Sequence, residues 1–219
     1  MPTRVGVVLF PGSNCEQDSI EAVRGLGGEA EIVWHADKSL GDVDAVIVPG
    51  GFAHGDYLRP GAIARFSPIM DAVVDFARNG GPVVGICNGF QVLTECGLLP
   101  GALQKNAGLK FLCRTVMLEV VTDRTSLTRN ARVGQQLAIP INHFEGNYTC
   151  DDETLAELHD EDRIVVRYVD NPNGSVADIA GVCNAEGNVV GLMPHPERAC
   201  HPLLGSEDGS VLVGSLLAG

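Results

Sequence analysis

The sequence predicts an α/β protein with a mostly parallel central sheet flanked by helices, and with a β-rich mixed or antiparallel portion in its second half. Three observations support this fold class. Short apolar runs alternate with helix-length segments through the first hundred residues, the early runs are apolar at almost every position, and the later runs are separated mostly by turns. Alternating strands and helices indicate parallel pairing, and uniformly apolar strands indicate a sheet covered on both faces.

In the first half, each apolar run ends at a turn signal, such as Pro11-Gly12-Ser13-Asn14 after the first run and Pro49-Gly50-Gly51 after the third. The glycine pairs at 27–28 and 80–81 suit helix ends, because glycine readily adopts the left-handed backbone conformation found there. The predicted strands are 5–10, 30–34, 45–48 and 83–86, and the predicted helices are about 16–26, 63–78 and 90–96.

The second half is predicted to be β-rich. After Cys96, strands are expected at 112–121, 136–141, 164–168, 179–183 and 189–193. No internal repeat, low-complexity tract or linker separates the two halves. We therefore interpret residues 1–219 as a single domain, which is within the usual size range.

Composition excludes several classes of function. The net charge is −13, and no stretch gathers Lys and Arg into a stripe suited to a phosphate backbone, so nucleic acid is not an expected partner. The first residues lead into a strand-like run without the features of a signal peptide, and no apolar run reaches membrane-spanning length, so a cytoplasmic protein is expected. Seven cysteines without a CxxC pair favour neither a disulfide framework nor a zinc site.

The segment Gly85-Ile86-Cys87-Asn88-Gly89 lies between a buried strand and a helix-like segment and predicts a nucleophile elbow. A sharp strand-to-helix turn brings the positions two before and two after its apex together, so both must be small. A helix amino terminus also favours thiolate over thiol. We therefore predict that Cys87 is the reactive cysteine. The other six are interpreted as small hydrophobes, the commoner fate of a free cysteine: Cys15, Cys96, Cys113, Cys150, Cys183 and Cys200.

A cysteine nucleophile needs a base that exchanges its proton, and that base needs an orienting partner. The segment Pro194-His195-Pro196-Glu197 contains both residue types. Two residues apart on an extended chain, His195 and Glu197 project to the same side, and the prolines restrict φ. We expect Glu197 to hold Nδ1 and leave Nε2 for Cys87. By itself, a His-x-Glu pair is more often structural than catalytic, as in a turn in which the histidine is only packed or solvated.

An oxyanion hole is the third requirement of such a site. The turn containing Gly50 and Gly51 follows a strand of the same parallel sheet as Cys87, and sites in such sheets lie at the carboxyl ends of strands. We expect a backbone N–H of Gly50 or Gly51, together with that of Asn88, to stabilise developing negative charge. Glycines after strands are also ordinary turn residues, so this assignment depends on Cys87.

Together these segments resemble the class I, triad-type glutamine amidotransferases, which share the order Cys, His, Glu. The resemblance is carried by Gly-x-Cys-x-Gly-x-Gln at 85–91, by the Pro-Gly-Gly turn at 49–51 and by the late His-Pro-Glu. More narrowly, the chain is similar to the small glutaminase subunits of phosphoribosylformylglycinamidine synthase, over segments that run from the first strand to the last helix. These segments are Phe10–Cys15, Gly50–Arg59, Cys87–Gln91 and Met193–Arg198.

The resemblance implies a flavodoxin-like sheet and a glutaminase that works through a glutamyl thioester on Cys87. Ammonia would pass to a large synthetase subunit, which binds ATP and magnesium and converts formylglycinamide ribonucleotide to formylglycinamidine ribonucleotide in de novo purine biosynthesis. A small bridging subunit often joins the two. No cofactor or metal is expected on this chain, which also has no phosphate-binding loop of its own.

The resemblance also implies substrate contacts. It places Gln91 near the amino-acid end of glutamine, and Asn142, His143 and Phe144 near the glutamine pocket. Phe144 stands where the family usually has glycine. A histidine between strands such as His143 is at least as compatible with a local structural hydrogen bond. The segments 11–15 and 55–59 are implied at a subunit interface or an ammonia exit, although physical chemistry alone describes them as turns.

Three alternatives remain. The chain could serve as the glutaminase of another synthetase, from which segments 11–15 and 55–59 distinguish it. It could be a stand-alone cysteine-elbow protein of the deglycase or stress type, against which the His195–Glu197 pair argues. It could be a regulatory subunit that binds glutamine without turnover, which an intact set of Cys87, His195 and Glu197 disfavours.

Overall fold

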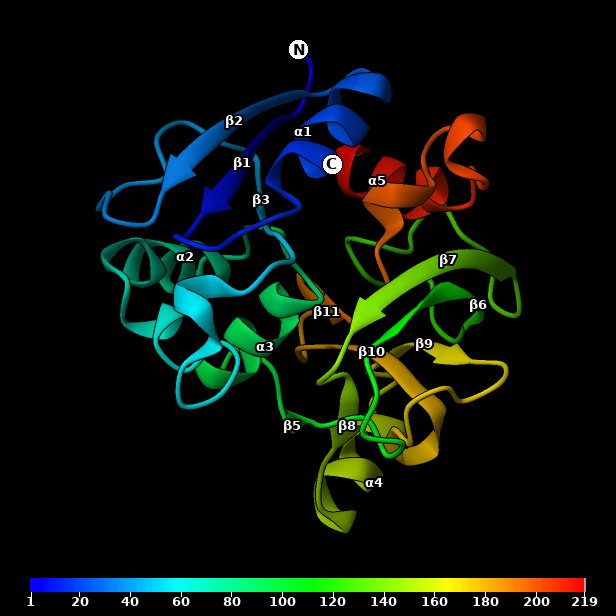
Figure 1. Cartoon of the computed structure of the whole chain (residues 1–219). Helices are drawn as coiled ribbons and strands as arrows, with labels where there is room; N and C mark the ends of the chain where they lie inside the picture. The colour runs from blue at the N-terminus through cyan, green and yellow to red at the C-terminus, as the bar shows by residue number, and fades with distance from the viewer. Residues whose placement is uncertain (219) are drawn as a thin grey trace.

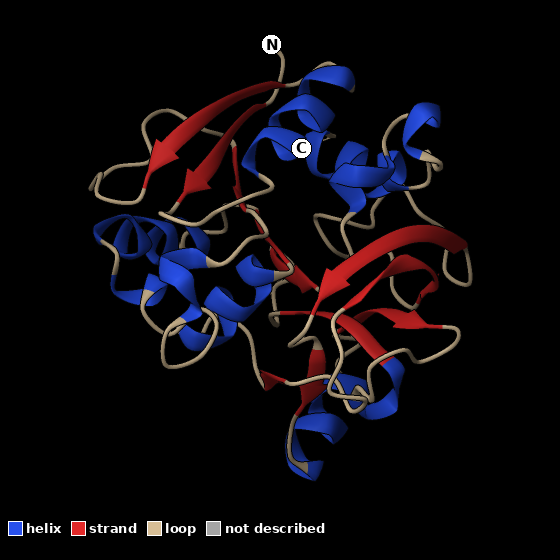
Figure 2. Ribbon diagram, viewed as in Figure 1, coloured by secondary structure: helices blue, strands red, loops and turns tan. Residues whose placement is uncertain are grey.

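The computed structural model describes residues 1–218, so Gly219, the last residue of the predicted domain, lies outside the described residues. A nine-stranded sheet runs through the molecule (Figure 1, Figure 2). From edge to edge it contains β2 (Glu29–Trp34), β1 (Arg4–Leu9), β3 (Ala45–Val48), β4 (Val83–Ile86), β11 (Val189–Leu192), β10 (Ile179–Cys183), β9 (Ile164–Tyr168), β6 (Leu112–Val120) and β7 (Gln136–His143).

The sheet has a parallel half and an antiparallel half. Strands β2, β1, β3, β4 and β11 pair parallel in the order of a flavodoxin-like sheet. Strands β11, β10, β9, β6 and β7 pair antiparallel, so β11 belongs to both halves. The predicted α/β class with a β-rich second half is therefore confirmed, and the β-rich portion extends the same sheet.

The predicted strands are all present, with ends that differ by one or two residues at most. The expectation that both faces of the early strands are covered was wrong for β2. This strand lies at the edge of the sheet, and its Ile32 and Trp34 are 42% and 41% exposed. Two short strands that pair antiparallel were not predicted: β5 (Ala102–Gln104) and β8 (Asn147–Thr149).

The α-helices are α1 (Glu16–Gly25), α2 (Pro68–Arg78), α3 (Asn88–Glu95), α4 (Asp152–Asp160) and α5 (Gly209–Leu217). In Figure 1, α1 and α5 lie together, whereas α2 and α3 lie on the other side of β1 and β3. The predicted helix 63–78 was too long, because Ser67 is extended before Pro68 and α2 starts at the proline. Short 3-10 turns are η1 (Ala53–Asp56), η2 (Ala64–Phe66), η3 (Val176–Asp178), η4 (Pro196–Ala199) and η5 (Pro202–Leu204).

The carboxyl ends of four parallel strands position the candidate site. The loop after β1 carries Cys15, the turn after β3 carries Gly51, the elbow after β4 carries Cys87, and the segment after β11 carries His195. These strands are almost wholly buried and bring the four segments to one edge of the sheet. Among residues 1–218, the structure contains no helix with the length and apolar character needed to cross a membrane.

Candidate active site

Cys87 occupies a strained turn between β4 and α3, as the sequence predicts. Its backbone has φ 52° and ψ −106°, and its N–H donates to the carbonyl of Leu192 at 2.8 Å. A side chain in this region costs about 1–3 kcal/mol, which the surrounding structure must support. The steric requirement for glycine is confirmed at both flanking positions. A Cβ on Gly85 would lie 2.7 Å from the backbone of Gly89, and a Cβ on Gly89 would collide with the carbonyl oxygen of Val48.

Glu197 holds His195 by the predicted contact, but the backbone conformation that brings the two side chains together differs from the expected one. Nδ1 of His195 lies 2.7 Å from Oε1 of Glu197, and both side chains are 1% exposed. The expected extended chain was wrong, because Glu197 belongs to the 3-10 turn η4, which begins at Pro196. The restricted φ of proline suits this first helical position.

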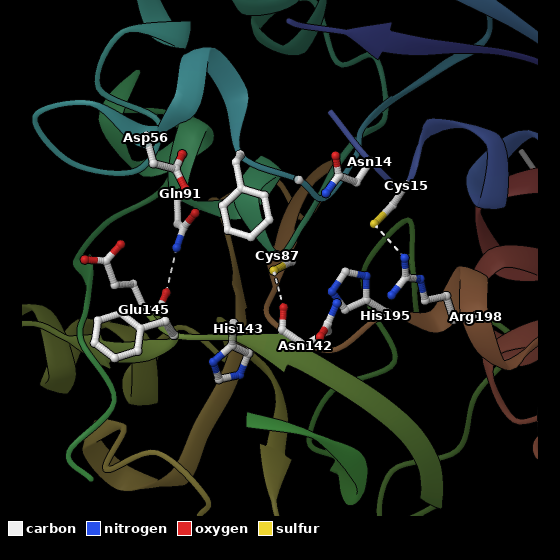
Figure 3. A pocket seen from close by; sticks show the side chains of 13 residues that line it. Asn14, Cys15, Asp56, Cys87, Gln91, Asn142, His143, Glu145, His195 and Arg198 are labelled. Atoms are coloured by element: carbon white, nitrogen blue, oxygen red, sulfur yellow. Dashed lines mark hydrogen bonds between the residues drawn. The ribbon is translucent and has the colours of Figure 1, made fainter. Parts of the chain in front are cut away.

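The environment of His195 favours its protonated form. Burial lowers the pKa of His195, whereas the charges of Glu197 and Cys87 raise it, and the net direction is well above the ordinary value. Its Nε2 atom is buried and has no hydrogen-bond partner among the described residues. His195 and Cys87 line the same pocket (Figure 3). The ring therefore has one nitrogen fixed and the other available to a ligand.

The three oxyanion candidates lie differently with respect to this pocket. Gly51 lines it, with φ 148° in a turn too close to Asn14 for a Cβ. Gly50 packs behind it, since a Cβ there would lie 2.8 Å from Cε1 of His195. Asn88 begins α3, where the backbone N–H has no acceptor inside the helix. Its side chain accepts from the N–H of Ala53 at 2.9 Å and so ties the glycine turn to the elbow.

The predicted substrate residues Gln91, Asn142, His143 and Phe144 all line the pocket. Sγ of Cys87 lies 3.8 Å from the carbonyl oxygen of Asn142, which is close enough for a weak S–H contact. The amide of Gln91 is largely used within the protein: its oxygen accepts from Asn88 at 2.8 Å, and its nitrogen donates to the carbonyl of Glu145 at 2.6 Å.

The His143 ring makes the local structural hydrogen bond that was one of its two expected roles, although His143 is the last residue of β7 and not between strands as expected. Its Nδ1 lies 3.1 Å from Oδ1 of Asn106. Burial and the charge at His195 lower the pKa of His143 to about 4, so the ring is neutral at physiological pH. In Figure 3 the ring points away from Cys87. The pocket contact of His143 thus differs from that of Asn142, whose side chain is on the opposite face of β7.

Six residues that were not named as site residues from the sequence also line the pocket: Asn14, Cys15, Phe52, Asp56, Glu145 and Arg198. The resemblance had implied the segments 11–15 and 55–59, which contain Asn14, Cys15 and Asp56, at a subunit interface or ammonia exit, and Cys15 was interpreted as a small hydrophobe. The sequence offered one indication for four of them. Asn14, Cys15, Phe52 and Asp56 follow β1 or β3 and therefore lie at the same sheet edge as Cys87. The guanidinium of Arg198 donates to Asp18 at 2.8 Å and to Sγ of Cys15 at 3.3 Å (Figure 3).

One group of side chains among residues 1–218 has the residue types that can bind a metal ion: Cys15, His195 and Glu197. Their possible ligand atoms lie within 4.8 Å of one another. However, His195 and Glu197 already form a hydrogen bond with each other.

Comparison with known proteins identifies the class. Residues 2–208 match the CobB/CobQ-like glutamine amidotransferase domain. With a cysteine elbow and a carboxylate-bound histidine at one sheet edge, the chain is a glutamine amidotransferase.

The relatives identify the family within that class. The chain is 58% identical over 216 residues to phosphoribosylformylglycinamidine synthase subunit PurQ of Rubrobacter xylanophilus, covering 99% of this chain and 98% of the relative. It is 55% identical to the subunit of the same name from Parasynechococcus marenigrum, covering 98% and 99%. This chain belongs to the PurQ family of phosphoribosylformylglycinamidine synthase subunits, which confirms the resemblance seen in the sequence.

Solved structures agree with this assignment. A chain in the structure of PurLQS from Thermotoga maritima is 44% identical, with a TM-score of 0.92 and coverage of 100% of this chain and 99% of that chain. A glutamine amidotransferase from the same organism is 16% identical, with a TM-score of 0.58 and coverage of 90% and 77%, and shares the fold.

Proposed function

We propose that this chain is the glutaminase component of phosphoribosylformylglycinamidine synthase and hydrolyses glutamine through a thioester on Cys87. One observation carries the proposal. His195, oriented by Glu197 at 2.7 Å, has a buried Nε2 without a partner among the described residues and lines the pocket that also contains the thiol of Cys87. A nucleophile, a base and an orienting carboxylate are the parts that acyl transfer through cysteine requires.

The first half-reaction releases ammonia. The thiolate of Cys87 attacks the side-chain carboxamide carbon of glutamine, and the backbone N–H groups of Gly51 and Asn88 stabilise the oxyanion. The imidazolium of His195 then gives its proton to the departing nitrogen. The C–N bond breaks, ammonia leaves, and a glutamyl thioester remains on the protein.

The second half-reaction restores the thiol. Neutral His195 takes a proton from water at Nε2 as the water oxygen attacks the thioester carbon. The C–S bond breaks, glutamate leaves, and Cys87 returns as a thiolate beside the imidazolium. Glu197 keeps Nδ1 protonated and the ring oriented in both steps.

The ammonia is used by a partner. We propose that a large synthetase subunit, with ATP and magnesium bound to it and not to this chain, converts formylglycinamide ribonucleotide to its amidine in the cytoplasm. The names of the relatives, which are synthase subunits, and the solved PurLQS relative support a partner of this kind. A small bridging subunit completes the proposed complex.

The test is glutamine-dependent amidine formation from formylglycinamide ribonucleotide and ATP by this chain mixed with the synthetase and bridging subunits. The control is Cys87→Ala. Product should form with the wild-type chain, disappear with Cys87→Ala, and return when ammonium is added. If the synthetase uses ammonium and the wild-type chain still gives no glutamine-dependent product, the proposal fails and a stand-alone cysteine enzyme becomes the better interpretation.

A further inference from the structure

Three side chains converge on the space beside Gly50: those of Cys15, Cys87 and His195. A Cβ at position 50 would lie 3.1 Å from Sγ of Cys15, 2.8 Å from Cε1 of His195 and 3.5 Å from Cβ of Cys87. The three side chains come from segments that follow three different strands, and all three line the pocket (Figure 3). Because position 50 is glycine, two thiols and an imidazole border one small space that a larger residue would fill.

His195 has the arrangement of a histidine that binds a metal ion. Its Nδ1 lies 2.7 Å from Oε1 of Glu197, and its buried Nε2 has no hydrogen-bond partner among the described residues. Metal-binding histidines usually donate one ring N–H to a carboxylate and bind the metal through the other nitrogen, because the carboxylate fixes the tautomer and makes the ring more basic. The hydrogen bond between His195 and Glu197 is therefore compatible with a metal ion, since it leaves Nε2 available.

Cys15 adds a thiol that the proposed glutaminase reaction does not use. Its side chain is 3% exposed, and its Sγ lies within 4.8 Å of a possible ligand atom of His195. Thiolate sulfur and imidazole nitrogen are typical ligands of zinc, at about 2.3 and 2.0 Å from the metal. In a tetrahedral site these bond lengths place the two ligand atoms about 3.6 Å apart. Small side-chain rotations are therefore enough to bring Cys15 and His195 to ligand spacing.

The charges around this space are suited to a divalent cation. Two thiolates and a neutral imidazole would balance the charge of zinc, and the carboxylate of Glu197 lies directly behind the ring. Arg198 opposes a cation, because its guanidinium donates to Sγ of Cys15 at 3.3 Å. Asp18 offsets the charge of Arg198, since its carboxylate accepts from the same guanidinium at 2.8 Å. Two further acids line the pocket: Asp56 and Glu145.

We propose that zinc(II) binds Sγ of Cys15, Sγ of Cys87 and Nε2 of His195 and reversibly inhibits the glutaminase. Zinc acts here as an inhibitor and not as a cofactor, because it occupies the nucleophile and the base together and displaces the proton from Nε2. The inference rests on the glutaminase function proposed above and adds a means of regulating the same site. The ligands are far apart in the chain, so no CxxC spacing marks this site in the sequence.

The test measures amidine formation by the assembled complex, with glutamine or with ammonium, while a chelator buffer sets the free zinc concentration. Zinc should inhibit the glutamine-dependent reaction and leave the ammonium-dependent reaction unchanged, and an excess of a zinc-selective chelator should restore activity. Each variant is compared with its own activity without zinc. Cys15→Ser should need at least about 10-fold more free zinc for half-inhibition, because even the loss of a hydrogen bond to a metal ligand costs that much affinity.

Cys113→Ser is the matched control. Cys113 is an exposed thiol in β6 and does not line the pocket, so its replacement should leave the zinc inhibition curve unchanged.

A second measurement does not depend on turnover. Cobalt(II) is added to the isolated chain as a probe for zinc, because cobalt bound to thiolate absorbs in the near ultraviolet through charge transfer from sulfur. The wild-type chain should show this absorption band. Cys15→Ser and Cys87→Ser should each weaken the band, and Cys113→Ser should retain it.

Two outcomes would overturn the zinc site. Half-inhibition of Cys15→Ser and wild type at the same free zinc would show that Cys15 is not a ligand. Equal inhibition of the ammonium-dependent reaction would place the zinc on the synthetase. A wild-type complex that uses ammonium but gives no glutamine-dependent product in the absence of zinc would instead contradict the proposed function, and the cobalt titration would still decide whether Cys15 and Cys87 bind a metal together.

Discussion

Nδ1 of His195 and Oε1 of Glu197 are 2.7 Å apart, and the protein buries both side chains almost completely. A buried carboxylate of this kind fixes the tautomer of the ring and stabilises the imidazolium that forms during acyl transfer. Replacing Glu197 with Gln keeps the shape but removes the charge. We expect glutamine-dependent kcat to fall by about 10³-fold or more, in line with similar changes in catalytic triads. Steady-state kinetics with glutamine measure this, and unchanged activity with ammonium verifies that the complex is intact.

The glycine requirement at the elbow can be tested through stability. A Cβ at position 89 would collide with the carbonyl oxygen of Val48 in a buried strand, so Gly89→Ala should lower the free energy of unfolding by about 3 kcal/mol or more. Gly214→Ala is the matched control. Gly214 lies inside α5 with no atom within 4 Å of the added Cβ, and alanine there should stabilise by about 0.5–1 kcal/mol. Chemical denaturation of both variants measures the contrast, and equal midpoints would contradict it.

His143 predicts a dependence of stability on pH. Its pKa is lowered from 6.5 to about 4 in the folded protein, so the unfolded chain binds a proton more readily. The contribution of this histidine is complete above pH 6.5 and is lost as pH falls toward 4, up to about 3 kcal/mol. His143→Gln, which can still donate to Asn106, should lose less stability than wild type between pH 7 and pH 4.5. Urea denaturation at the two pH values measures the free energy of unfolding of each protein. An equal loss of that free energy in wild type and in His143→Gln would exclude His143 as the source.

The isolated chain is expected to hydrolyse glutamine at least about 10-fold more slowly than the assembled complex. The oxyanion donors belong to a glycine turn and a helix start, where small misalignments reduce catalysis by about that factor or more. A coupled glutamate assay with and without the synthetase measures the ratio. If the free chain were as active as the complex, the site would already be aligned without its partner.

Local chemistry explains which parts of the site were predictable. The elbow at Cys87 requires small residues at fixed positions, and Gly85 and Gly89 lie within two residues of it. The His195–Glu197 pair is also local, and its contact was predicted although its 3-10 turn was not. By contrast, Asp56 meets Asn88 over 32 residues of chain, and Gln91 meets Glu145 over 54. Such meetings depend on how loops fold over the sheet, which periodicity does not indicate.

The fold shows the same division. Strands of the core follow from apolar runs, and they were found almost to the residue. The helix α4 was missed, although Asp151 accepts from the N–H of Thr154 at 2.8 Å as a typical N-cap. Its turn signals lie in a short polar segment that buries only Leu158 within the helix, so no apolar periodicity marks it.

The pairing of β4 with β11 has a consequence for how this enzyme can change over time. Ile86 is in register with Leu192, and the N–H of Cys87 donates to the carbonyl of Leu192. The distance between nucleophile and base is therefore set by adjacent strands of the buried core. Insertions and deletions in the surrounding surface loops can alter partners and regulation without separating these two groups. A one-residue slip between the two strands would abolish the chemistry, so sequence drift should be far slower in these strands than in the loops they support.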